Sequence, residues 1–105
     1  MDEATFDELA RAELRDLEEK FLDVDPDEVE ATGTDGVLEL ALKDGVRIII
    51  NTQRPTRQLW MAAVANAWRF DYDRDERLWR TARGAELRST LAGVIADRIG
   101  LAVAL

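Results

Sequence analysis

Carboxylate side chains are concentrated in the first thirty residues of the chain. Residues 1–30 contain 13 Asp or Glu and three basic residues, which gives this segment a net charge of −10. The remaining residues include 11 basic and 9 acidic side chains, so the acidity is local. Like charges held close together repel one another, and a bound cation or a basic partner relieves that repulsion. We therefore interpret the segment as a binding surface, although a solvated helix face without a binding role would show the same charge.

Carboxylate oxygens are ligands for hard cations. They suit ferrous or ferric iron, manganese, calcium and magnesium, and they are poor partners for zinc and copper. The predicted metal ligands are Asp16, Glu18, Glu19, Asp23, Asp25 and Asp27. Exposed carboxylates that must converge by side-chain motion should bind an ion weakly, with a dissociation constant of roughly micromolar or higher. An EF-hand loop starting at Asp23 is excluded, because Glu28 and Thr34 stand where glycine and glutamate are required.

The residue types that most catalytic and structural metal sites use are missing. The chain has no Cys and no His, which excludes disulfides, thiolate sites and cysteine nucleophiles. Lys20, Lys43 and Ser89 have no evident general base nearby, so we predict a protein without catalytic activity. A net charge of −8 disfavours nucleic acid and anionic lipid as partners. No stretch resembles a signal peptide or a membrane span, so we expect a cytoplasmic location.

An amphipathic helix of about twenty residues must position the first carboxylates. Its apolar stripe consists of Phe6, Leu9, Ala10, Leu14, Leu17 and Phe21. The opposite side carries a negative ridge made by Glu8, Asp16, Glu19 and Asp23. Glu13 projects close to the apolar stripe, and we expect its carboxylate to reach water or to pair with Lys20 or Arg11. Pro26 rules out continuation of the helix.

Short β-rich runs follow the helix. The first three lie at 29–33, 36–43 and 45–53 and are separated by the turn tripeptides TDG and KDG. Leu38, Leu40 and Leu42 alternate with polar or small residues, which is typical of a sheet with one buried face. Three further strands are predicted at 59–64, 67–73 and 77–81.

A second helix is predicted after Gly84. Its helical periodicity comes from Leu87, Leu91, Val94, Ile95 and Ile99, and Gly100 stands where helices commonly end. The apolar tail 101–105 is expected to lie back on the domain. These elements predict an α+β fold in a single domain, residues 1–105. In this two-layer sandwich both helices pack on one face of an antiparallel sheet of about six strands.

Trp60 is a second candidate contact residue. Alternation along 59–64 turns Leu59 and Met61 inward and Trp60 onto the open face of the sheet, beside Asn51 and Gln53. An exposed tryptophan of this kind is typical of a contact patch. The alternative is partial burial of the ring under Arg54 or Arg57. The predicted partner-binding residues are therefore Glu18, Glu19, Asp23, Asn51, Gln53 and Trp60.

The order of elements and several local strings resemble the bacterial frataxin family, the CyaY-type proteins of iron–sulfur cluster biogenesis. The most specific string is IIINTQRPTRQLWMA at 48–62, which is similar to the family's run of Asn, Gln, Pro and Gln leading to Trp. LEEKFLDVD, GVLEL, FDYD and RLW fall in the family's order. The chain departs from the family in lacking the histidine-containing segment before the FD motif, where it reads ANAWRFDYD.

The resemblance implies a regulator of iron–sulfur cluster assembly. It implies weak, carboxylate-bound iron, Fe²⁺ or Fe³⁺, with other divalent cations as possible guests, and it leaves room for iron oxidation as a side activity. It also implies a cysteine desulfurase and a cluster scaffold protein as partners, with the acidic ridge docked on the desulfurase. We expect a monomer that can oligomerise with metal. A metal-independent acidic regulator of the same machinery and a self-assembling iron store remain as alternatives.

Overall fold

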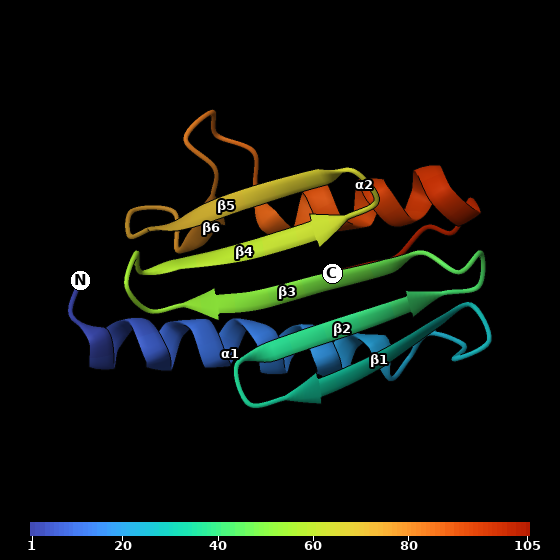
Figure 1. Ribbon diagram of the computed structural model, residues 1–105, viewed down its shortest axis with the longest axis horizontal. Coiled ribbons are helices and arrows are strands. Elements are labelled where there is room, and N and C mark those ends of the chain that lie inside the picture. The colour runs from blue at the N-terminus through green and yellow to red at the C-terminus, as the bar shows by residue number, and fades with distance from the viewer.

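The six strands follow one another across a single antiparallel sheet in the order of the sequence (Figure 1). The computed structural model describes residues 1–105. The strands are β1 (Val29–Thr34), β2 (Val37–Leu42), β3 (Arg47–Gln53), β4 (Gln58–Ala63), β5 (Asn66–Asp73) and β6 (Leu78–Arg80), and the helices are α1 (Glu3–Phe21) and α2 (Leu87–Ile99). Both helices cover one face of the sheet, and the other face is open (Figure 1). The predicted two-layer α+β sandwich is confirmed.

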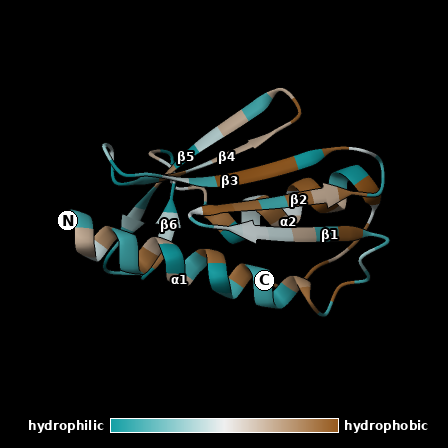
Figure 2. Ribbon diagram, turned by 60° about the horizontal axis from the view of Figure 1, so that its bottom comes forward, coloured by the Kyte–Doolittle hydropathy of each residue, from teal (hydrophilic) through white to brown (hydrophobic).

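Helix α1 begins at a side-chain cap. The Asp2 carboxylate accepts the N–H of Thr5 at 2.7 Å, which satisfies one of the free N–H groups of the first turn. All but one of the residues of the predicted apolar stripe are buried, and Leu9 is half-buried. In Figure 2, hydrophilic and hydrophobic bands follow one another along α1, and hydrophobic segments are visible in β2 and β3. Neither helix is long and apolar enough to cross a membrane.

Tight turns and strict alternation shape the first half of the sheet. Gly36 and Gly45 have φ of 75° and 90°, a region that glycine enters without strain, and this allows the two short turns that flank β2. Leu38 and Leu40 of β2 and Ile48 of β3 are almost completely buried. The alternation predicted from the sequence therefore identifies the buried face correctly.

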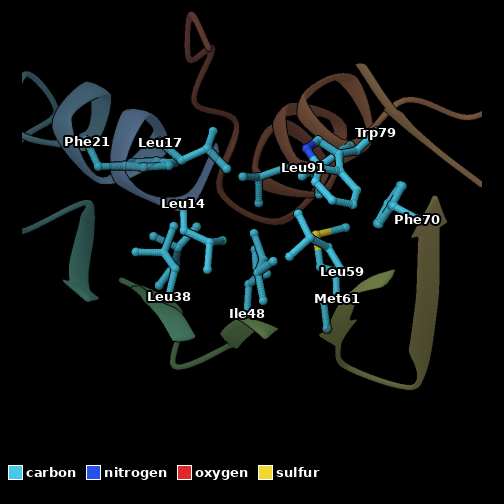
Figure 3. Close-up of a cluster of buried hydrophobic side chains, with 14 of the residues drawn as sticks. Leu14, Leu17, Phe21, Leu38, Ile48, Leu59, Met61, Phe70, Trp79 and Leu91 are labelled. Atoms are coloured by element: carbon cyan, nitrogen blue, oxygen red, sulfur yellow. The ribbon is translucent and has the colours of Figure 1, made fainter. Parts of the chain in front are cut away.

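The core lies between the sheet and the two helices (Figure 3). At one end Trp79 of β6, which is 2 % exposed, packs edge-on against Phe6 of α1, with ring centroids 6.0 Å apart. Its other neighbour is Tyr72 of β5, at 5.2 Å between centroids. The short strand β6 thus contributes the residue that joins α1 to the far side of the sheet.

Helix α2 is capped at both ends. The Glu86 carboxylate accepts the N–H groups of Arg88 and Ser89, and Gly100 ends the helix with a φ of 67°. The tail after Gly100 lies back on the core through Leu101, Val103 and Leu105, as predicted.

Candidate metal and partner surface

Five carboxylates around the C-terminal end of α1 and the start of β1 have neither a basic partner nor a main-chain hydrogen bond. We call them the acidic surface: Glu18, Glu19, Asp23, Asp27 and Glu30. All except Glu18 are exposed to solvent, and Glu18 is half-buried. The structure therefore leaves four of the six predicted metal ligands and all three predicted acidic partner-binding residues free to bind a cation.

The position of the acidic surface on α1 is electrostatically unfavourable. The C-terminal end of a helix carries a partial negative charge, which repels nearby carboxylates. Glu18 and Glu19 lie in the last turn of α1 and Asp23 follows two residues after its end, so like charges are crowded at the negative end of the helix. Lys20 is the one basic residue in the last turn, and it lies 3.6 Å from Asp16. A bound cation or a basic partner would remove this repulsion.

Asp16 belongs to a different set of contacts from the acidic surface. Its carboxylate accepts a hydrogen bond from Arg88 of α2 at 2.6 Å, and this contact holds the pKa of Asp16 below its usual value of 3.8. Glu13 binds the same guanidinium through both oxygens, at 2.8 and 2.9 Å. Arg88 also donates to the main-chain oxygen of Leu105 at 2.8 Å. Arg88 therefore links α1, α2 and the C-terminal tail.

The expectation that Glu13 reaches water or pairs with Lys20 or Arg11 is wrong. Its side chain is 14 % exposed, and its partner is Arg88, 75 residues further along the chain. A carboxylate beside an apolar stripe needs a cation when the stripe is buried. That requirement is visible in the sequence, but the periodicity of the second helix does not identify Arg88 as the partner.

Two further carboxylates near the acidic surface already have partners. The Asp25 carboxylate accepts the N–H of Asp27 at 2.9 Å, an interaction that stabilises the turn between α1 and β1. Glu28 forms an ion pair with Lys43 at 2.7 Å. A cation bound by Asp25 would have to share this carboxylate with the turn.

Glu18 leans over the edge strand β1. Gly33 has no side chain, and the Glu18 carboxylate fills the space in front of it: a Cβ built on Gly33 would lie 2.6 Å from Cδ of Glu18. The close approach leaves Glu18 at the mouth of a hollow between α1 and β1 that Arg15 also lines. The least exposed carboxylate of the acidic surface therefore faces the sheet edge.

The donor set fits iron, but the geometry is not preassembled. All candidate ligands are carboxylate oxygens, which suit ferrous and ferric iron. No group of three or more carboxylates lies close enough together to hold a metal ion. Glu19 and Asp23 would hold an ion together with water, and other carboxylates of the surface would join by side-chain rotation. Such a site would hold an ion weakly and exchange it readily.

Trp60 lies on the open face of the sheet but is only half-exposed. The guanidinium that covers its ring is that of Arg69 on β5, 4.6 Å from the ring centroid, not Arg54 or Arg57 as the alternative proposed. Asn51 is the direct cross-strand neighbour of Trp60, and Asn51 accepts a hydrogen bond from Gln53 at 3.0 Å. The three predicted residues thus form one patch, with Arg69 as the member that the sequence did not reveal.

The fold and the site together define a class of protein: a small α+β sandwich with an acidic helix end on one side and a tryptophan patch on the open sheet. A family model for the frataxin-like domain matches residues 1–101. The chain is 36 % identical over 108 aligned positions to the iron–sulfur cluster assembly protein CyaY of Cupriavidus necator, covering 100 % of this chain and 96 % of that protein. This protein therefore belongs to the frataxin-like family.

Other relatives agree with this assignment. CyaY of Pseudomonas aeruginosa is 39 % identical over 80 residues, which cover 76 % of this chain and 73 % of that protein. Among solved structures, frataxin from Psychromonas ingrahamii superposes with a TM-score of 0.89 at 27 % identity and covers 98 % of this chain and 96 % of that one. Trimeric yeast frataxin complexed with ferrous iron superposes with a TM-score of 0.68 at 26 % identity. The match covers 96 % of this chain and 88 % of that one.

Proposed function

We propose that this protein regulates iron–sulfur cluster assembly in the cytoplasm. Its acidic surface binds iron weakly and docks on a basic patch of the cysteine desulfurase that supplies sulfur, and the protein itself carries out no catalytic step. Family membership supports the pathway, because its CyaY relatives are iron–sulfur cluster assembly proteins. The docking partner and the iron are supported by the chemistry of the acidic surface.

The observation that carries the proposal is the set of unpaired carboxylates at the C-terminal end of α1. Most other acidic residues of α1 and the β1–β2 turn have partners, such as Asp7 with Arg54 and Asp35 with Arg11. The acidic surface has none, and it lies where the helix dipole adds to the negative potential. A surface that keeps this arrangement in the free protein gains most from a positively charged partner.

Iron is cargo in this proposal and not a resident cofactor. Two carboxylates with water hold ferrous iron loosely, and the site can release it to the assembly machinery. The Trp60 patch serves as a second contact area for the machinery, including the cluster scaffold protein, because it presents a half-exposed aromatic ring and amide groups together.

A second candidate function is docking without metal. The absence of any preassembled group of three carboxylates favours it. In that case the acidic surface steers and orients the partner, and iron binding is incidental.

Reversing charge on the acidic surface tests the docking. Replacing Glu18, Glu19 and Asp23 together with lysine should weaken binding to the desulfurase at least about tenfold, since charge pairs at such interfaces are lost and replaced by repulsion. Salt at about 0.5 M should weaken the wild-type complex through screening. Titration calorimetry measures both effects.

The matched control reverses three exposed, unpaired carboxylates elsewhere, Asp75, Glu76 and Asp97. This variant has the same net charge as the triple variant and should keep its affinity. Equal loss in both variants would assign the effect to overall charge and contradict a localised docking site. Binding that does not respond to salt would contradict electrostatic docking.

A further inference from the structure

Strand β1 forms an uncovered edge of the sheet next to the acidic surface (Figure 1). The N–H of Lys43 donates to the oxygen of Glu28 at 3.0 Å, and the register pairs Glu30 with Ala41 and Thr32 with Glu39. In an antiparallel ladder, hydrogen-bonded residue pairs such as these alternate with pairs that are not hydrogen-bonded to each other. The N–H and C=O groups of Ala31 and Gly33 therefore point away from the sheet, and no side chain hydrogen-bonds to them.

The opposite edge of the sheet is protected. Strand β6 has three residues, and Arg80 pairs with Glu86, so the chain itself covers that edge. Short or covered edges are the usual way in which proteins avoid pairing with other chains. Strand β1 has six residues and no cover. It is the one edge of this sheet that is open to a further strand.

A groove runs beside this edge, between β1 and α1. One hollow of about 450 Å³ is lined by the half-buried side chains of Val24 and Ala31, above Phe21 and Val29, which are buried. A second of about 170 Å³ continues past Gly33. Leu22, a large apolar residue that is 79 % exposed, also lines the first hollow. The groove therefore offers apolar contacts next to free main-chain donors and acceptors.

The larger hollow is lined by more acidic than basic residues, whereas Arg11 and Arg15 balance Glu18 and Asp35 in the smaller one. Glu18, Glu19 and Glu30 line the larger hollow, and Arg15 is its one basic residue. Glu30 and Thr32 project onto the open side of the sheet, whereas Val29 and Ala31 face α1. A strand added at this edge would place alternate side chains over the apolar groove and beside Glu30.

We propose that the β1 edge takes up an extended segment of a partner, in which apolar and basic residues alternate, as a seventh strand of the sheet. The inference rests on the proposed docking of the acidic surface and specifies how the partner is held. Main-chain hydrogen bonds to Ala31 and Gly33 provide affinity, apolar residues fill the groove, and basic residues on the other face of the added strand meet Glu30. A second copy of this chain is disfavoured, because two acidic edges repel each other.

A short peptide tests strand addition directly. We use acetylated Arg-Val-Arg-Val-Arg-Val amide as the probe and the same peptide N-methylated at its internal amides as the control. The first peptide should shift the amide signals of Ala31 and Gly33 and slow their hydrogen exchange. The N-methylated peptide keeps the charge but loses its internal main-chain hydrogen-bond donors, so it should bind at least about tenfold more weakly. Equal affinity of the two peptides would overturn the proposal.

A variant of β1 gives the complementary test. Ala31→Pro removes an outward N–H, a change that edge strands tolerate, and it should weaken peptide and desulfurase binding at least about tenfold. Thr32→Ala, on the same strand, leaves every outward N–H in place and should bind normally. Should Ala31→Pro fail to fold, the two peptides decide the question on the wild-type protein.

The outcomes separate this inference from the proposed function. Desulfurase binding that survives Ala31→Pro but is lost in the lysine variant of the acidic surface overturns strand addition and leaves docking intact. Survival of binding in both variants overturns both. If the wild type self-associates and Ala31→Pro abolishes this self-association, the edge binds a second copy of the chain, and the inference is also overturned.

Discussion

Replacing Arg88 with leucine should lower the free energy of unfolding by about 3 kcal/mol, because removal of one partner leaves shielded carboxylates without a counter-charge. Arg88 is 20 % exposed and Glu13 is 14 % exposed, so water replaces little of the lost interaction. Asp16 and the main-chain oxygen of Leu105 lose a donor at the same time. For a domain of this size the melting temperature should fall by roughly 15 °C.

Urea denaturation with Arg98→Leu as the matched control measures this effect. Arg98 lies on the same helix and pairs with Asp44 at 3.1 Å, but it is 43 % exposed, and exposed pairs contribute at most about 1 kcal/mol. Similar losses in the two variants would contradict a special role for Arg88.

The contacts of Arg88 also predict how the stability of the protein depends on pH. Arg88 holds the pKa of Asp16 below 3.8 in the folded protein. A carboxyl group whose pKa is depressed by folding stabilises the protein above its unfolded pKa, and this contribution is lost as the pH falls through the folded value. The stability difference between wild type and Arg88→Leu should therefore shrink when the pH falls below about 4. A constant difference down to acid pH would assign the effect of Arg88 to packing alone.

Truncating Trp79 to alanine should destabilise the protein by about 3–5 kcal/mol. The ring is 2 % exposed and packs edge-on against Phe6 and Tyr72, so its removal opens a cavity between α1, β5 and β6. A loss of that size is comparable to the whole stability of many small domains. Chemical denaturation followed by far-UV circular dichroism measures it without relying on tryptophan fluorescence.

The control is Trp79→Phe, which keeps an aromatic ring and should cost clearly less. If alanine and phenylalanine were equally tolerated, the short strand β6 would not be the junction that the packing indicates.

Local periodicity predicted nearly all of the fold. The buried stripe of α1 and the alternation in β2 follow from the spacing of apolar side chains. Each pattern can be read within its own segment of the sequence. The turns at Gly36 and Gly45 are equally local, because glycine is the residue that adopts a positive φ without strain. Elements of this kind can be identified without knowing what they pack against.

The contacts that the sequence did not reveal join distant segments. Arg88 meets Glu13 across 75 positions, and Arg69 covers Trp60 from the neighbouring strand. Many arginines could have filled either role, and only the packing of α2 on the sheet and the register of β4 with β5 select these two. For the same reason the sequence could not show that Asp16 pairs with Arg88 and so differs from the other predicted metal ligands.

An anaerobic ferrous titration followed by amide NMR tests directly whether the acidic surface binds iron. Signals should shift or broaden first within residues 16–30. Replacing Glu19 and Asp23 with alanine should remove the response, whereas alanine at Asp75 and Glu76 should leave it intact. Signals that respond mainly outside this segment, or a response unchanged in the Glu19 and Asp23 variant, would show that the acidic surface does not bind the iron.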